Sequence, residues 1–178
     1  LFFGYLTKYK GIELLIESFR SVSDNGLLLV VAGGEPDHAT RESDHGMYIN
    51  SLKAAAKTIS QDIMFTGFLR ETEFADYFCA ADLVVFPYPE MHAASGPFCL
   101  ALSYRRPFLV SRPFGSFYGI PEELTFEYNS LSLAARIRQL RTTQELRSLA
   151  LRWGKSFMEG RTWDCVARET IHAYRSVS

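Results

Sequence analysis

Residues suited to binding an anion stand in two short segments, each directly after an apolar run. The first segment, 4–11, places Lys10 beside Gly11 and immediately before a stretch with helical periodicity. A cation at the positive end of a helix dipole is locally unfavourable unless both face a shared anion such as a phosphate. Lys10 is therefore a candidate anion-binding residue, and a surface lysine in a turn is the alternative interpretation.

The second segment, 86–97, is the richer of the two. Ser95 is a predicted helix N-cap, because Pro97 suits the first helical position, where its missing N–H costs nothing. Small residues before Pro97 let a ligand approach the main chain, and the amides of a helix start bind phosphate oxygens. The remaining candidates in this predicted cradle are two polar rim residues and two small residues: Glu90, His92, Ala94 and Gly96.

Two further apolar runs are followed by weaker signals. Gly33 and Gly34 lack the full G-x-G-x-x-G pattern, so they indicate only a close approach to the backbone by a ligand or by another part of the chain. Gly67 precedes two apolar residues, Phe68 and Leu69. These two either form a wall for a nucleobase or belong to the core, and the sequence leaves both interpretations open.

The elements that must position these residues alternate between strands and helices. The apolar runs that predict strands are Leu1–Phe3, Leu27–Ala32, Ile63–Phe65, Leu83–Phe86 and Phe108–Val110. They are not alternately polar and apolar, so we expect both faces of the sheet to be covered. The intervening helical stripes imply right-handed crossovers and a parallel sheet. The fold class is therefore α/β, a Rossmann-like doubly wound parallel sheet with a helical C-terminal tail.

We expect one domain over residues 1–178, with alternation in 1–129 and the helical tail in 130–178. Three stripes define the tail: Leu133, Ile137 and Leu140; Leu146, Leu149, Trp153 and Phe157; and Trp163, Val166, Ala167, Thr170, Ile171 and Tyr174. Basic residues are dense here, which favours solvated helix faces over a surface for a membrane or a partner.

Composition narrows the function classes. The chain has 178 residues, of which 47% are hydrophobic and 22% charged, with a net charge of −1, so disorder is excluded and nucleic acid is not the expected partner. Three widely spaced cysteines form no zinc or disulfide pattern and favour a reducing compartment. No apolar run is long enough to span a membrane. The chain opens within a strand-like run, which we interpret as a piece of a longer polypeptide.

The ordered set of motifs resembles the C-terminal, donor-binding domain of retaining GT-B glycosyltransferases of family 4. The matching blocks, which cover roughly residues 1–140, are Phe3-Gly4, Tyr9-Lys10-Gly11-Ile12, Leu29–Gly34, Phe65–Leu69, Ala80–Tyr88, Ala94-Ser95-Gly96, Ala101-Leu102 and Arg106–Ser111. The resemblance implies one half of a GT-B fold. It also implies transfer of a sugar, with retention, from a UDP- or GDP-linked donor to a glycan or lipid-linked acceptor.

The resemblance also assigns roles. It implies that Lys10 and the amides around Ser95 and Gly96 contact the donor diphosphate, and that 67–69 lies against the base. The predicted catalytic residues are Lys10 and Glu90. The predicted substrate-binding residues are Gly4, Lys10, Gly33, Gly67, Phe68, Leu69, Glu90, His92, Ala94, Ser95 and Gly96. No cofactor or metal is implied, and Asp37, His38, Asp44 and His45 are interpreted as a polar loop.

Two departures from the family pattern stand out. The glutamate that usually holds the ribose falls by register at Leu100, and an arginine usual after the first strand's glycine is Tyr5. A GT-B-like module that binds or scaffolds without catalysis is therefore the alternative function. The expected partners are the nucleotide-sugar donor and the protein's own N-terminal domain, which lies outside this chain. The expected location is cytoplasmic, with peripheral contact at the inner face of the membrane, and this piece alone is expected to be inactive.

Overall fold

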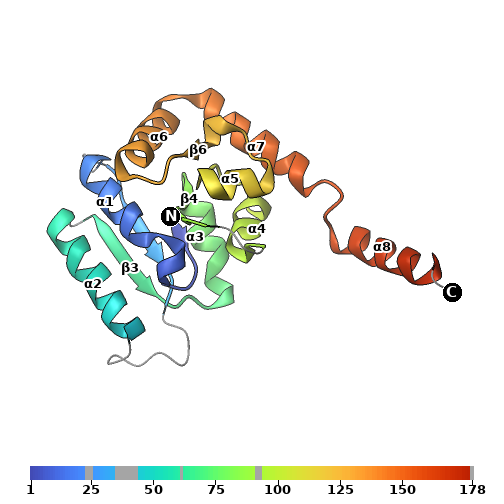
Figure 1. Ribbon diagram of the computed structural model, residues 1–178, viewed down its shortest axis with the longest axis horizontal. Helices are drawn as coiled ribbons and strands as arrows, with labels where there is room; N and C mark the ends of the chain where they lie inside the picture. Colours follow the sequence, from blue (N-terminus) through green and yellow to red (C-terminus); the bar gives the residue numbers. More distant parts are fainter. Residues whose placement is uncertain (23–25, 35–43, 61, 91–93, 177–178) are drawn as a thin grey trace.

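The computed structural model describes the chain except residues 23–25, 35–43, 61, 91–93 and 177–178 (Figure 1). The strands are β1 (Phe2–Phe3), β2 (Leu29–Ala32), β3 (Ile63–Gly67), β4 (Val84–Phe86), β5 (Phe108–Ser111) and β6 (Thr125–Phe126). The α-helices are α1 (Ile12–Val22), α2 (Asp44–Ile59), α3 (Phe74–Ala80), α4 (Gly96–Ser103), α5 (Arg112–Tyr118), α6 (Ser130–Thr142), α7 (Gln144–Met158) and α8 (Trp163–Ser176). Short 3-10 turns occupy Lys8–Lys10, Glu71–Glu73 and Glu122–Leu124.

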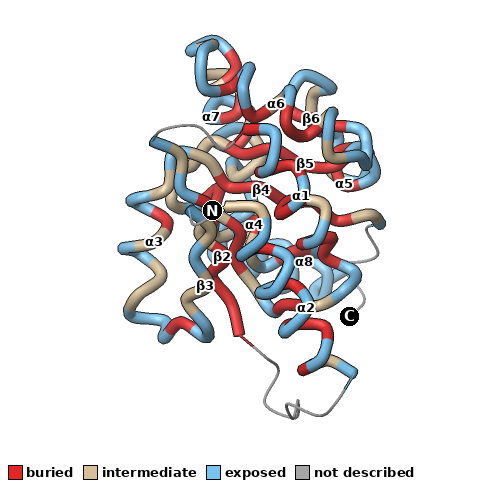
Figure 2. The backbone as a smooth tube through the Cα atoms, turned by 90° about the vertical axis from the view of Figure 1, so that its left-hand side faces the viewer, coloured by how far each residue is buried: buried red, intermediate tan, exposed pale blue. Residues whose placement is uncertain are grey.

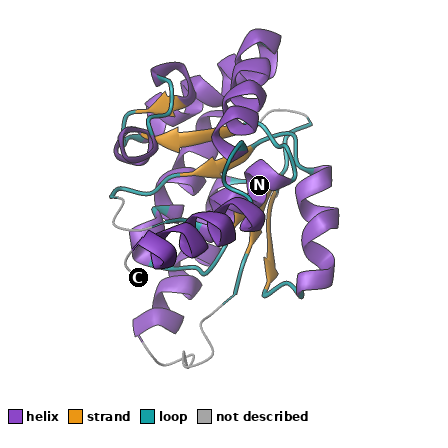
Figure 3. Ribbon diagram, turned by 90° about the vertical axis from the view of Figure 1, so that its right-hand side faces the viewer, coloured by secondary structure: helices purple, strands orange, loops and turns teal. Residues whose placement is uncertain are grey.

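The strands form two parallel ladders, β1-β2-β3 and β4-β5-β6. Two hydrogen bonds join the ladders between β1 and β4. The Val85 amide donates to the Leu1 carbonyl at 2.9 Å, and the Leu1 nitrogen donates to the Leu83 carbonyl at 2.7 Å. The resulting strand order is 3-2-1-4-5-6, with helices on both sides (Figure 3). This confirms the Rossmann-like sheet, whose topological switch point lies between β1 and β4.

The core lies along the central strands and the helix faces against them (Figure 2). Every residue of β1, β4, β5 and β6 is buried. Of the helical stripes between the predicted strands, the one on α1 is buried throughout: Ile12, Leu15, Ile16, Phe19 and Val22. Burying five such side chains stabilises the fold by about 1.5–3 kcal/mol each. Helix α1 contacts both α2 and α6, and α4 contacts α7, so the helical tail covers the same sheet as the first helices.

Three expectations need correction. Strand β6 and helix α5 were not predicted, because a two-residue strand and a seven-residue helix carry too little periodicity to detect. Strand β3 is not covered on both faces: none of its residues is fully buried, since it forms an edge of the sheet. The helical stripe that the sequence predicts on α2, formed by Leu52, Ala55, Ala56 and Ile59, is only partly buried. Ala55 faces solvent, while Leu52 and Ala56 are in the core.

The tail is helical as predicted, but its last helix does not pack. Helix α8 has no buried residue and projects away from the sheet (Figure 1). Its large side chains are open to solvent, with Trp163 87% and Tyr174 73% exposed. The third predicted stripe therefore forms an apolar helix face without a covering partner in the described structure.

Candidate functional site

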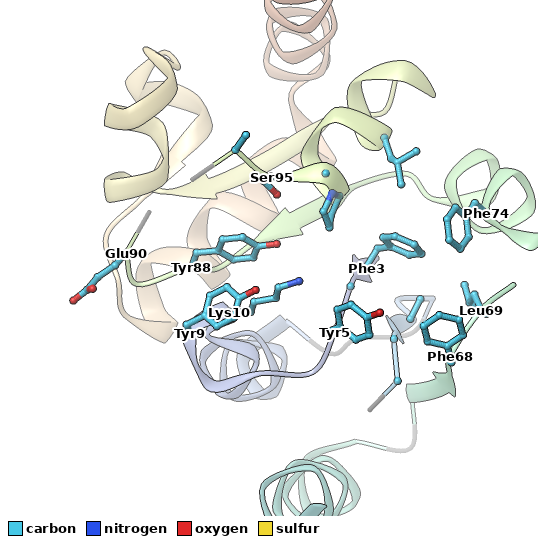
Figure 4. A pocket seen from close by; sticks show the side chains of 18 residues that line it. Phe3, Tyr5, Tyr9, Lys10, Phe68, Leu69, Phe74, Tyr88, Glu90 and Ser95 are labelled. Atoms are coloured by element: carbon cyan, nitrogen blue, oxygen red, sulfur yellow. The ribbon is translucent and has the colours of Figure 1, made fainter. Parts of the chain in front are cut away.

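A cavity of about 790 Å³ opens at the carboxyl ends of β1 to β4, across the switch point. This is the place where open parallel sheets bind ligands. Its walls come from the loops after all four strands (Figure 4). The lining residues are Phe3, Gly4, Tyr5, Tyr9, Lys10, Ala32, Gly33, Gly34, Phe68, Leu69, Phe74, Tyr88, Glu90, Ala94, Ser95, Gly96, Pro97 and Leu100.

Two glycines bring the segments after β1 and β4 together. Gly11 has a left-handed backbone (φ +63°), and a Cβ there would lie 1.9 Å from the Pro87 carbonyl oxygen. A Cβ on Gly4 would lie 2.6 Å from Lys10 Nζ and 3.4 Å from Pro97 Cγ. The ammonium after β1 and the start of α4 after β4 therefore flank one small space, and that space is part of the cavity.

Lys10 is a buried cation in the cavity wall. Only 5% of the residue is exposed, and no carboxylate of the described residues forms an ion pair with it. Its Nζ instead lies 5.7 Å from the ring centroids of both Tyr9 and Tyr88. Burial lowers the pKa of Lys10 to about 8. An unpaired buried ammonium is costly, and an anion in the cavity would offset that cost.

The start of α4 is capped as predicted. Ser95 Oγ accepts a hydrogen bond from the Phe98 amide at 3.3 Å, and Pro97 stands in the first turn. The Ser95 amide donates to Tyr118 Oη at 2.9 Å, so it is already engaged. Since Pro97 has no N–H, Gly96 is the first-turn residue whose amide stays available within the described structure.

The opposite side of the cavity is aromatic and apolar. Phe68 is 64% exposed and its ring lies 6.2 Å from that of Tyr5, whereas Leu69 is only 6% exposed. The two residues of this pair are buried to very different extents. Leu69 belongs to the core and also lines the cavity, whereas Phe68 presents an exposed ring there (Figure 4).

Gly33 and Gly34, which follow β2, allow neighbouring loops to pack closely. A Cβ on Gly33 would lie 1.8 Å from the Gly4 carbonyl oxygen, and one on Gly34 would meet the Phe68 backbone at 2.9 Å. These glycines let three loops approach one another at the cavity wall. Gly67 adopts φ +75° and is not among the lining residues, although Phe68 and Leu69, which follow it, are.

Of the two predicted polar rim residues, Glu90 lines the cavity. Glu90 is exposed, and its carboxylate points away from Lys10 and Tyr88 (Figure 4). Ala94 lines the cavity, and His92 lies outside the described residues. Leu100 does reach the cavity wall, one turn after Gly96 on the same face of α4. The position where the family pattern has a ribose-binding glutamate is therefore an apolar contact.

Sequence reasoning missed the tyrosines of this site. Tyr9 and Tyr88 line the cavity beside Lys10, and Tyr118 holds the Ser95 amide. The tyrosines lack a spacing pattern, so only their place directly after predicted strands could have drawn attention to Tyr9 and Tyr88. Among the described residues, no three His, Cys, Asp or Glu side chains converge as a metal site, and no described helix is long and apolar enough to cross a membrane.

A Rossmann-like sheet with a buried lysine and a capped helix start at its switch point defines an α/β domain with a candidate anion site at the carboxyl ends of its strands. The sequence profile of the family described as "Glycosyl transferases group 1" matches residues 1–142. The chain therefore belongs to the group 1 glycosyltransferases.

Known proteins agree with this assignment. A GDP-mannose:glycolipid 4-beta-D-mannosyltransferase of Xanthomonas campestris pv. campestris is 32% identical over 110 residues, covering 62% of this chain and 29% of its own length. A glycosyltransferase of Rickettsia africae superposes with a TM-score of 0.81 at 14% identity, over 99% of this chain and 46% of its own. HepE of Anabaena, solved with UDP, superposes with a TM-score of 0.78 at 16% identity, over 99% of this chain and 48% of its own. The chain thus spans less than half the length of these relatives.

Proposed function

We propose that this chain is the donor-binding half of a glycosyltransferase that transfers a sugar from a UDP- or GDP-linked donor to a glycan or lipid-linked acceptor. The observation that carries the proposal is the convergence of Lys10 Nζ and the start of α4 on one cavity at the switch point. Family membership and the nucleotide-sugar named for the Xanthomonas relative support it.

The geometry suits the leaving group of such a reaction. Negative charge accumulates on the diphosphate as the glycosidic bond breaks, and preorganised positive groups lower the barrier without moving a proton. Lys10 supplies a full charge, and the Gly96 amide supplies a hydrogen bond at the positive end of α4. Loss of one such group raises the barrier by about 2–4 kcal/mol. This proposal needs no metal, and Glu90 would act only after reorienting toward the cavity.

Two stereochemical outcomes have support. The family resemblance favours retention. The Xanthomonas relative, by its name, makes a β-mannoside from GDP-mannose, and because the mannose of that donor is α-linked, a β product requires inversion. Proton NMR of the anomeric signal at early reaction times, with the full-length protein, distinguishes the two: an α product supports retention and a β product supports inversion.

The rest of the enzyme would cover the cavity and supply the acceptor site. Helix α8 has an apolar face and no buried residue. We expect it to contact the N-terminal domain of the enzyme, which lies outside this chain. Since a GT-B cleft closes between two halves, the 178-residue chain alone should bind donor without turnover. The described cysteines form no disulfide, which supports a reducing, cytoplasmic location.

Calorimetric titration of the 178-residue chain with UDP and GDP tests donor binding. We expect one of the two to bind, and Lys10→Ala to weaken that binding at least tenfold. Lys53→Ala, an exposed lysine on α2, is the matched control and should bind as the wild type does. Absence of binding to both nucleotides would overturn the proposal. Binding without donor turnover in the full-length protein would favour the scaffold alternative, which the departures at Tyr5 and Leu100 support.

A further inference from the structure

One hydroxyl in the cavity wall has no partner. Tyr88 follows β4, between two prolines, and only 3% of the residue is exposed. Within the described structure its Oη makes no hydrogen bond, although water does not reach it. Buried hydroxyls almost always have a partner, so an orphaned one calls for an explanation.

The tyrosine cannot turn away to find a partner. Its ring packs edge-on against Phe114 at 5.3 Å and Phe86 at 6.0 Å, and its carbonyl accepts a hydrogen bond from Ser111 Oγ. The packing holds the ring, and the hydroxyl points toward the side of the cavity where Lys10 Nζ lies (Figure 4), covered by neighbouring atoms in the unliganded structure. A ligand oxygen therefore reaches it only after a small shift of these neighbours. The Lys10 ammonium lies 5.7 Å from the centre of the same ring.

The neighbouring hydroxyl does not satisfy Tyr88. Burial raises the pKa of the Tyr88 phenol, and the nearby Ser95 hydroxyl lowers it by less. However, Ser95 Oγ is used to cap α4, and the two hydroxyls do not reach hydrogen-bond geometry. Tyr88 therefore stays neutral and keeps a donor proton at physiological pH.

We propose that Tyr88 Oη donates a hydrogen bond to a diphosphate oxygen of the bound nucleotide, beside the Lys10 ammonium. The inference rests on the proposed function and deepens it. Lys10 and Tyr88 are two buried donors in one wall that have no acceptor among the described residues, and a diphosphate supplies acceptors to both. In this chain, Tyr5 stands where the family pattern has an arginine, so the charge of that arginine is missing. The Tyr88 hydroxyl adds a contact to the diphosphate, but it adds no charge.

Tyr88→Phe tests this role, because it removes the hydroxyl and keeps the ring. We expect the Kd for the nucleoside diphosphate to rise about ten- to hundredfold, and the Kd for the nucleoside to stay unchanged. We also expect the melting temperature of the unliganded chain to stay equal or rise, since an unsatisfied buried group is removed. Tyr104→Phe is the matched control: that ring stacks on Phe78 outside the cavity.

The outcomes separate the two proposals. If the wild type binds UDP or GDP and Tyr88→Phe binds as tightly, the Tyr88 contact is wrong and the donor site stands. If Tyr88→Phe lowers the melting temperature of the unliganded chain, the hydroxyl has a structural partner and the inference also fails. If the wild type binds neither nucleotide, the proposed function fails and this contact fails with it.

Discussion

Gly11 and Pro87 fit against each other with no room for a side chain between them. A Cβ on Gly11 would lie 1.9 Å from the Pro87 carbonyl oxygen and 2.8 Å from Tyr128 Oη. The contact fixes the turn that carries Lys10 against the loop that leads from β4 to α4. Two segments more than seventy residues apart in the chain are therefore held at one cavity by the absence of a single methyl group.

Gly11→Ala should consequently disturb both stability and donor binding. The left-handed backbone alone costs about 1 kcal/mol with alanine, and the clash with a backbone oxygen raises the total to several kcal/mol. Gly119→Ala is the matched control, because Gly119 has φ +67° with no atom within 4 Å of a Cβ. Urea unfolding should show a much larger loss for Gly11→Ala. Equal losses would mean that the Pro87 contact relaxes freely.

The pH dependence of binding should report the buried ammonium. Burial lowers the pKa of Lys10 to about 8, so above that pH the unliganded protein must take up a proton to present a cation. We expect the Kd of the wild type for the nucleoside diphosphate to rise up to tenfold per pH unit above pH 8. In Lys10→Met the Kd should not depend on pH in this way. Calorimetry from pH 7 to 10 measures it. A flat profile for the wild type would contradict a cationic role.

The lowered pKa of Lys10 affects stability in the opposite direction: stability rises with pH, whereas nucleotide binding weakens. The pKa of Lys10 is about 8 in the folded chain and near its ordinary value of 10.5 when unfolded. The unfolded state therefore binds more protons between these values, and this group makes the folded chain more stable as pH rises from 8 to 10.5. Lys10→Met removes that contribution. The difference in unfolding free energy between the wild type and Lys10→Met should become smaller from pH 8 to pH 10.5.

The sequence predicted the part of the site that depends on chain order. Parallel strands end at one edge, so Lys10 and Ser95 were expected to meet there, and they do. It did not predict the proposed role of Tyr88, because whether that hydroxyl has a partner depends on neighbours from β4, α4 and α5 that packing brings together. The direction in which the Glu90 carboxylate points likewise depends on the conformation of the loop after β4. Strand β6 escaped detection because two residues cannot show a period.

Phe68 should contribute to binding through its exposed face. Since 64% of the residue is exposed, Phe68→Ala should leave stability almost unchanged. Loss of a stacking surface for the base should raise the Kd for UDP or GDP about tenfold and leave the Kd for inorganic pyrophosphate unaltered. Leu131→Ala, which removes another exposed apolar side chain, is the control. A parallel loss of pyrophosphate binding would place Phe68 at the phosphates.

Leu100 offers a test of how this cavity holds the ribose. It lies one turn beyond Gly96 on the cavity-facing side of α4 and is partly exposed, so a carboxylate there would remain solvated. Leu100→Glu should strengthen binding of the nucleoside diphosphate about tenfold, because a carboxylate accepts hydrogen bonds from two ribose hydroxyls. The gain should vanish with a 2′,3′-dideoxy nucleotide and should shrink in Leu100→Gln, which keeps the shape without the charge. An unchanged Kd with the ordinary nucleotide would place the ribose away from this position on α4.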